Sequence, residues 1–90
     1  MIQYEIVITG RVQGVGYRYF TLKKAAEFHI KGWVKNTTDG RVEVVAQGDE
    51  TDVNTFIDYL QMGPPLARVD KLSKYKMHDL TDFHKFSVKY

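Results

Sequence analysis

The chain has 90 residues, a length at which one domain builds one core, and we expect a single domain over residues 1–90. Hydrophobic residues make up 43% of the chain and aromatic residues 13%, which excludes an intrinsically disordered protein, and the absence of cysteine excludes a disulfide scaffold and a thiol nucleophile. The net charge is only +2 and the two signs are mixed along the chain, so charge gives weak support for nucleic-acid binding.

The first 29 residues predict a strand, a glycine-rich loop and a helix. The segment QYEIVITG (3–10) alternates apolar and polar residues, as a largely buried strand does. Residues 17–29 contain neither proline nor glycine and are followed by Gly32, which favours a helix of about three turns. The residues expected to face the core from this helix are Tyr17, Thr21, Ala25 and Phe28.

A hairpin is the clearest local signal in the chain. The segments IKGWVKN (30–36) and RVEVVAQG (41–48) are typical of strands, and TTDG (37–40) separates them. The Asp39-Gly40 pair supplies the left-handed backbone that a tight hairpin needs. We therefore expect these two strands to pair antiparallel.

The second half predicts another helix and two further strands. Residues 49–63 carry apolar side chains at i, i+3, i+4 and i+7, with Asp49 as the expected N-cap and Gly63 as the stop before two prolines. The four apolar residues of this stripe are Val53, Phe56, Ile57 and Leu60. Two extended runs follow, at 67–77 and 84–90, joined by a polar turn.

Together these elements predict an α+β fold of the ferredoxin-like kind. The order β-α-β-β-α-β gives a two-layer sandwich: an antiparallel sheet with an extra C-terminal strand, and two helices on one face. In this topology the first strand and the strand that holds Trp33 run in the same direction, joined by a right-handed crossover. The glycine loop and Asn36 are therefore expected at the same edge of the sheet.

The glycine loop GRVQGVG (10–16) leads directly into the first predicted helix. The first backbone N–H groups of a helix have no internal partner and attract an anion, and Gly10, Gly14 and Gly16 let a bulky oxyanion approach the backbone. Arg18 falls in the first turn, where a cation is disfavoured unless an anion lies nearby. These features suggest a phosphate cradle, but spacing alone leaves open a simple tight turn with Arg18 as a surface residue.

Asn36 ends the strand before the TTDG turn and has two interpretations. Its amide can bond to its own backbone, as turn formers do. Alternatively, the amide faces the glycine loop, where it can orient a water molecule toward an electrophile without changing its protonation state.

Two segments of the chain resemble the signature motifs of the acylphosphatase family. GRVQGVGYRYF (10–20) resembles the family's glycine-flanked V-Q-G-V-G-F-R, and GWVKNTTDGRVEV (32–44) resembles its G-W-V-x-N followed by a turn and V-E. The motifs occur in the same order and separation, and the element pattern agrees across essentially all 90 residues. The departure is Tyr17 in place of phenylalanine, whose added hydroxyl must reach water or a partner.

The resemblance implies an enzyme that hydrolyses the carboxyl-phosphate bond of acyl phosphates. At the matching positions, Arg18 would bind the phosphoryl group together with backbone N–H groups, and Asn36 would hold the attacking water. The residues whose backbone would form this cradle are Gln13, Gly14, Val15, Gly16 and Tyr17. The resemblance implies no metal and no other cofactor.

The expected partners are a small-molecule acyl phosphate and inorganic phosphate, the latter as product and inhibitor. We expect a cytoplasmic monomer that binds neither nucleic acid nor a membrane. The expectation about the membrane rests on the sequence, in which no apolar stretch approaches the length of a membrane span. The physiological acyl group stays open, because the sequence indicates a grip on the phosphoryl end and no pocket for the acyl part.

Two other functions compete with this interpretation. RNA-recognition domains share the element order, but their stacking aromatics belong on the third strand, where RVEVVAQG has none. Similar domains also occur fused within maturation proteins that handle acyl or carbamoyl phosphates; the short chain without a linker favours a free-standing form. His29, His78 and His84 lack partners at metal-ligand spacing and are interpreted as surface residues, and Trp33 as a packing residue.

Overall fold

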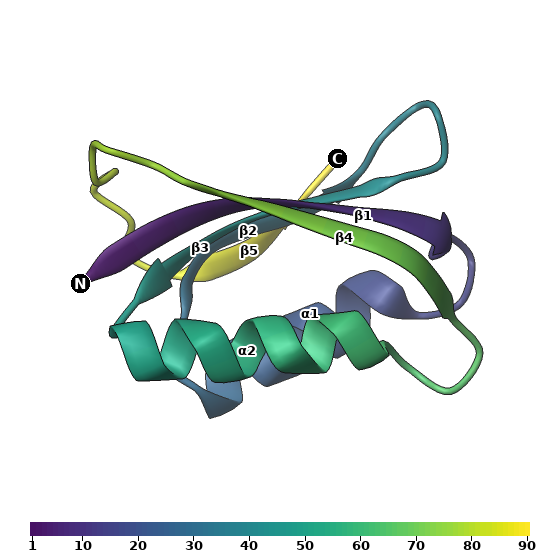
Figure 1. Ribbon diagram of the computed structural model, residues 1–90, viewed down its shortest axis with the longest axis horizontal. Helices are drawn as coiled ribbons and strands as arrows, with labels where there is room; N and C mark the ends of the chain where they lie inside the picture. Colours follow the sequence, from purple (N-terminus) through teal and green to yellow (C-terminus); the bar gives the residue numbers. More distant parts are fainter.

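The computed structural model describes all 90 residues and contains two helices and five strands. The elements are β1 (Ile2–Arg11), α1 (Tyr17–Glu27), β2 (Lys31–Asn36), β3 (Val42–Gly48), α2 (Glu50–Met62), β4 (Arg68–Lys76) and β5 (Phe86–Lys89). Every predicted element is present and in the predicted order. The ferredoxin-like two-layer arrangement is confirmed, with both helices packed on one face of the sheet (Figure 1).

The five strands form one sheet in the order β4-β1-β3-β2-β5. β1 pairs antiparallel with β3 and β4, and β3 pairs antiparallel with β2, whereas β5 joins β2 in parallel. The sheet is therefore mixed, with one parallel pair at the edge formed by the extra strand. The reason is the connection through residues 77–85, which leaves the end of β4 and crosses to the opposite edge, so that β5 starts at the end of the sheet where β4 stops.

The core lies between the sheet and the helices, and the predicted stripes supply it. All four residues of the α2 stripe are buried, and Tyr17, Thr21 and Ala25 are buried on α1. Phe28 differs: it lies just beyond the end of α1 and is only half-buried, where its ring stacks on Tyr59. Burial of these side chains against β1, β2 and β3 holds the start of α1 at a fixed place relative to the sheet.

The turns differ in detail from the sequence prediction. In the β2–β3 connection only Gly40 has a positive φ, at 92°, and the hairpin closes through a hydrogen bond of 2.9 Å from the Thr37 N–H to the Arg41 carbonyl. The connection is therefore longer than a two-residue turn. Asp49 occupies the N-cap of α2 as predicted, although its side chain makes no capping hydrogen bond, and Gly63 ends the helix with φ of 70°.

The hydroxyl of Tyr17 reaches a partner in the other helix. It donates a hydrogen bond of 2.5 Å to the carbonyl oxygen of Leu60, and both side chains are buried. In an α-helix this carbonyl would accept from the residue four positions on, which here is Pro64 and has no N–H. Tyr17 therefore satisfies a carbonyl that the proline leaves without a backbone donor, and it ties α1 to the end of α2.

We expect Tyr17→Phe to lower the free energy of unfolding by about 1–2 kcal/mol, because the Leu60 carbonyl then stays buried without a partner. Denaturant unfolding at pH 8 measures this difference. Tyr75→Phe is the matched control, since Tyr75 is exposed on β4 and makes no such bond. Equal stabilities for the Tyr17 and Tyr75 variants would contradict the assigned role.

The same bond predicts a pH dependence. Burial raises the pKa of the Tyr17 phenol well above its ordinary value, so the folded chain keeps the proton when the unfolded chain begins to lose it near pH 10. The contribution of Tyr17 to stability is complete below that pH and declines above it, by up to about 1.4 kcal/mol per pH unit. The stability gap between the wild type and Tyr17→Phe is therefore expected to narrow from pH 10 upward.

Candidate active site

The glycine loop and Asn36 meet at one end of the sheet, as predicted. β1 and β2 run in the same direction with β3 between them, so the loop after β1 and the end of β2 lie at the same end of the molecule, on the right in Figure 1. A crevice of about 180 Å³ opens there. Its lining residues are Val12, Gly14, Gly16, Tyr17, Arg18, Tyr19 and Asn36.

The loop backbone presents N–H groups without partners in the protein. Gly14 and Gly16 have positive φ angles of 72° and 81°, a conformation that only glycine adopts at little cost. No backbone N–H of residues 13–19 donates to another backbone group, and the N-cap of α1 has no side-chain cap. The positive end of the α1 dipole thus borders the crevice with its donors free, which is the arrangement that binds an oxyanion.

The three glycines of this motif have two different roles. A Cβ at Gly14 or Gly16 would meet no protein atom within 4 Å, so these two are needed for their backbone angles and leave open space beside the loop. A Cβ at Gly10 would lie 2.1 Å from the carbonyl oxygen of Arg68 on β4. Gly10 belongs to β1 beside a break in the β1–β4 register and is needed for strand pairing. The prediction that Gly10 serves the oxyanion is therefore wrong.

Arg18 brings a positive charge to the crevice that no acidic side chain neutralises. It is half-buried, forms none of the ion pairs in the protein, and the first turn of α1 contains no acidic residue. Its guanidinium carbon lies 5.3 Å from the ring centroid of Tyr90. A cation at a helix N-terminus is unfavourable without an anion, and the guanidinium fork fits two oxygens of a phosphate.

Asn36 is the last residue of β2, where it pairs with Val42 of β3. Its Oδ1 is buried and accepts no hydrogen bond from the protein. A turn former would use this oxygen to accept from its own backbone, so the local-turn interpretation does not account for it. A buried acceptor without a partner costs free energy unless water or a ligand bonds to it. The amide oxygen therefore has unused capacity to accept a hydrogen bond, and Asn36 is a residue that lines the crevice.

The side chain of Gln13 has a role that the sequence did not reveal. Its Nε2 donates to the carbonyl oxygens of Thr37 and Arg41, at 2.8 Å each. Both acceptors belong to the β2–β3 connection that follows Asn36. Gln13 therefore fastens the glycine loop to the hairpin, and this contact fixes the two halves of the crevice relative to each other.

Three of the five predicted cradle residues, Gly14, Gly16 and Tyr17, line the crevice. Gln13 and Val15 do not line it: Gln13 points to the hairpin, and the Val15 side chain is 8% exposed in the core. Their backbone N–H groups stay part of the predicted cradle. The structure adds Val12 and Tyr19, which have no signal in the sequence beyond being next to the motif.

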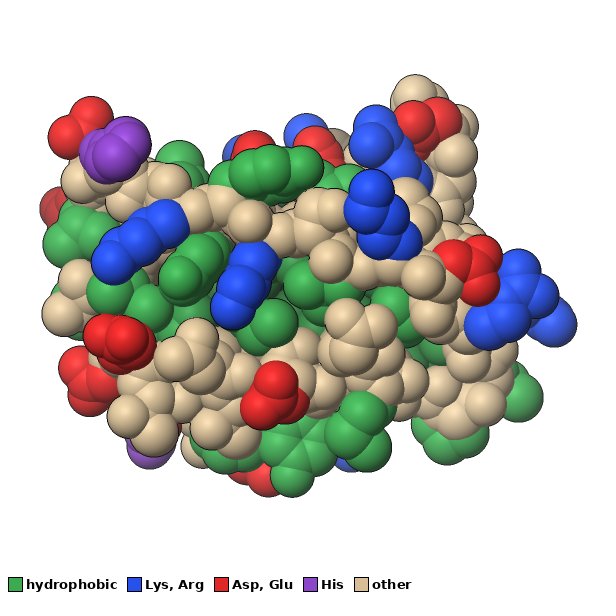
Figure 2. Space-filling model, viewed as in Figure 1, with side chains coloured by type: hydrophobic (Ala, Val, Ile, Leu, Met, Phe, Trp, Pro, Cys, Tyr) green, Lys and Arg blue, Asp and Glu red, His purple; other side chains and the backbone are tan.

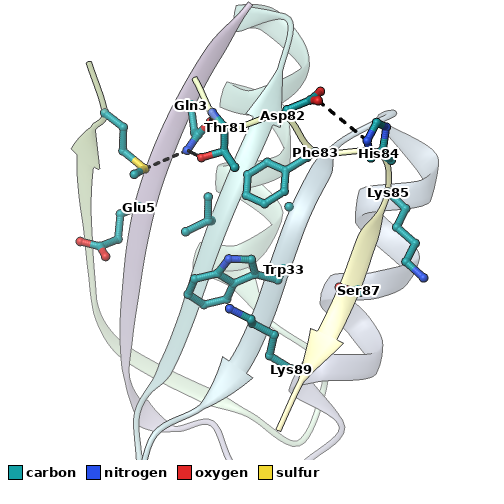
Figure 3. A pocket seen from close by; sticks show the side chains of 13 residues that line it. Gln3, Glu5, Trp33, Thr81, Asp82, Phe83, His84, Lys85, Ser87 and Lys89 are labelled. Atoms are coloured by element: carbon teal, nitrogen blue, oxygen red, sulfur yellow. Dashed lines mark hydrogen bonds and ion pairs between the residues drawn. The ribbon is translucent and has the colours of Figure 1, made fainter. Parts of the chain in front are cut away.

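The other features singled out from the sequence lie away from the crevice. The largest hollow, about 610 Å³, lies on the sheet face opposite the helices. Trp33 lies there as a half-buried ring, with Lys89 beside it, and Phe83 of the 77–85 connection also lines the hollow (Figure 3). It shares no residue with the crevice. The three histidines are exposed, as predicted, and no group of three or more His, Asp or Glu side chains is arranged to hold a metal ion.

Basic and acidic side chains are mixed on the face of the molecule that Figure 2 draws. The two signs alternate on this face and no extended basic patch forms there. β3 presents Glu43, Val45 and Gln47 on the sheet face where an RNA-recognition domain carries stacking aromatics. Neither helix is long and apolar enough to cross a membrane.

These observations define the class of the protein: a ferredoxin-like sandwich with a crevice between the β1–α1 loop, whose backbone N–H groups are free, and the end of β2. The family model described as acylphosphatase matches residues 4–88. The chain is 44% identical to an acylphosphatase from Archaeoglobus fulgidus over 90 residues, which is the full length of both proteins. The chain therefore belongs to the acylphosphatase family.

Solved structures agree with this assignment. The acylphosphatase from Bacillus subtilis is similar with a TM-score of 0.97 and 42% identity, over 100% of both chains. HypF from T. kodakarensis contains a similar unit, with a TM-score of 0.87 and 37% identity, over 100% of this chain and 12% of that one. The same fold thus occurs both as a complete small protein and as a small part of a longer chain.

Proposed function

We propose that this protein hydrolyses acyl phosphates to a carboxylate and inorganic phosphate, as its family membership indicates, and that the crevice is the active site. Arg18 and the loop N–H groups bind the phosphoryl oxygens. Asn36 orients the attacking water. The observation that carries this assignment is that one small crevice is lined by the free loop amides, by Arg18, which has no acidic partner, and by Asn36, whose amide oxygen accepts no hydrogen bond from the protein.

These few groups are sufficient for the chemistry. Phosphoryl transfer passes through a loose transition state that spreads negative charge over the equatorial oxygens, so fixed donors and one guanidinium supply most of the stabilisation. The leaving group is a carboxylate, whose conjugate acid has a pKa of about 4, so it departs without being protonated. The site therefore needs no general acid.

The attacking water also needs no strong base. In a loose transition state, bond formation to water lags behind the breaking of the bond to the carboxylate oxygen. The proton of the water is acidic only late in the reaction, when the phosphate oxygens themselves can accept it. The role of Asn36 is then to hold the water in line, by accepting one of its hydrogen bonds at Oδ1.

The fold of one chain brings both Arg18 and Asn36 to the same crevice, so the proposed site does not require a residue from a second copy. We therefore propose that the protein acts as a monomer. Its expected location in the cytoplasm stays a prediction.

A steady-state assay with benzoyl phosphate in the presence of excess EDTA tests the proposed function. Because charge is stabilised by Arg18 and backbone amides, we expect turnover to be the same with and without the chelator, and inorganic phosphate to inhibit competitively. The control is phenyl phosphate, whose leaving group is far more basic and should not be hydrolysed at a comparable rate. Failure to hydrolyse benzoyl phosphate would contradict the proposal.

A further inference from the structure

A second groove adjoins the crevice at Arg18. It has a volume of about 300 Å³, and four of its five lining residues carry apolar or aromatic side chains. The lining residues are Arg18, Tyr19, Leu22, Val88 and Tyr90. Arg18 and Tyr19 line the crevice as well, so the two hollows are adjacent, whereas Asn36 does not border the groove.

A polar hollow adjoins the crevice on the side of Asn36. It has a volume of about 500 Å³ and is lined mainly by polar residues of the β2–β3 connection, such as Thr37, Thr38 and Arg41. Asn36 belongs to both this hollow and the crevice, and Arg18 does not border it. Tyr90 borders the polar hollow and the apolar groove, so its side chain separates the two.

The direction of the reaction distinguishes these two openings. The oxygen of water attacks phosphorus on one side, the bond from phosphorus to the acyl oxygen breaks on the other, and its electron pair stays on the departing carboxylate. If Asn36 holds the water, the acyl group leaves on the side away from Asn36. The opening that borders Arg18 and not Asn36 is the apolar groove.

We propose that this groove binds the acyl part of the substrate, and that the enzyme selects acyl phosphates whose acyl group is apolar; this inference rests on the proposed function. Tyr19 is 67% exposed and Tyr90 fully exposed, and covering two such rings with an apolar group removes their surface from water. Arg18 stands at the junction, where its five donors serve the phosphoryl oxygens and the carboxylate that develops beside them.

Butyryl phosphate and acetyl phosphate make a matched pair of probes. Their leaving carboxylates have nearly the same basicity, so a difference in kcat/KM reports contacts of the acyl chain and not leaving-group chemistry. Each buried methylene is worth about fourfold in affinity, and we expect the wild type to prefer butyryl phosphate by about five- to fifteenfold in kcat/KM. A ratio near one in the wild type would overturn the proposal.

Leu22→Asn tests the groove directly, because Leu22 lines the groove and not the crevice. We expect the preference for butyryl phosphate to fall below about threefold. The kcat/KM for acetyl phosphate should fall by at most about twofold, because acetyl phosphate has two methylenes fewer to place in the groove. Leu66→Asn is the matched control, since Leu66 is 72% exposed and borders none of the hollows, and it should keep the wild-type preference.

Val88→Thr provides a second test that conserves the shape of the side chain and replaces one methyl group by a hydroxyl. This substitution should also lower the preference for butyryl phosphate. For both groove variants, Leu22→Asn and Val88→Thr, the inhibition constant for inorganic phosphate should stay as in the wild type, which would show that the crevice is intact. An unchanged preference for butyryl over acetyl phosphate in both variants would overturn the groove assignment. The proposed function would still stand in that case, provided that the enzyme turns over acyl phosphates and is inhibited by inorganic phosphate. A wild type that hydrolyses neither substrate would overturn the proposed function and the groove together.

Discussion

Replacing Arg18 by alanine is expected to lower kcat/KM for an acyl phosphate by about 10²–10³ and to abolish inhibition by inorganic phosphate. The physical reason is that Arg18 is the charged group of a crevice whose other donors are neutral amides, and no acidic side chain competes for it. Its removal takes away the charge that the phosphoryl oxygens meet both on binding and in the transition state. Steady-state kinetics with phosphate as inhibitor measure both effects.

Arg11→Ala is the matched control for Arg18. Arg11 is an exposed residue at the end of β1 that does not line the crevice, so its loss changes the net charge equally. We expect near wild-type turnover for this variant. If Arg18→Ala kept near-normal turnover and phosphate inhibition, or if Arg11→Ala lost as much, the phosphate site would have to be placed elsewhere.

Replacing Asn36 by alanine is expected to separate catalysis from binding. We expect kcat to fall about a hundredfold, because a misplaced nucleophile alone costs on this order, while the inhibition constant for inorganic phosphate changes little. The distinction follows from the structure: the phosphate donors lie on the loop and Arg18, whereas Asn36 contributes from β2 a buried oxygen that accepts no bond from the protein.

The control for this prediction is Asn54→Ala on the exposed surface of α2, which should leave both constants unchanged. A variant of Asn36 that weakened phosphate binding and left kcat intact would mean that the amide contacts the substrate and not the water. A loss of stability large enough to unfold the protein would be seen in the melting temperature and is not expected, because Oδ1 contributes no hydrogen bond to the fold.

The candidate site was visible in the sequence as far as it rests on local pattern. Glycines before a helix, an arginine in its first turn and an asparagine at a strand end all lie in short segments, and the βαβ topology alone is enough to bring them to one edge. The family resemblance of the same two segments agreed with this reading. The wrong assignment of Gly10 came from giving all glycines of one motif the same function. A glycine is needed at this position because a Cβ would collide with the β4 backbone at Arg68, 58 residues away in sequence.

The features that the sequence did not reveal depend on contacts between distant segments. Gln13 bonds the β2–β3 connection, Tyr17 bonds the end of α2, and neither side chain differs in sequence context from a surface glutamine or a core tyrosine. The proposed acyl groove is built by α1 and β5, which are brought together only because β5 joins the sheet next to β2.

The amino-acid sequence by itself determined the elements, the ferredoxin-like order and the residues of the candidate site, because hydrophobic period, turn residues and helix ends are local properties of a chain. The tertiary structure alone decided the parallel edge strand, the partner of the Tyr17 hydroxyl, the bond from Gln13 to the hairpin and the groove beside Arg18. Each of these is a contact between residues far apart in the chain, and such contacts are set by how the layers pack and not by any pattern within one segment.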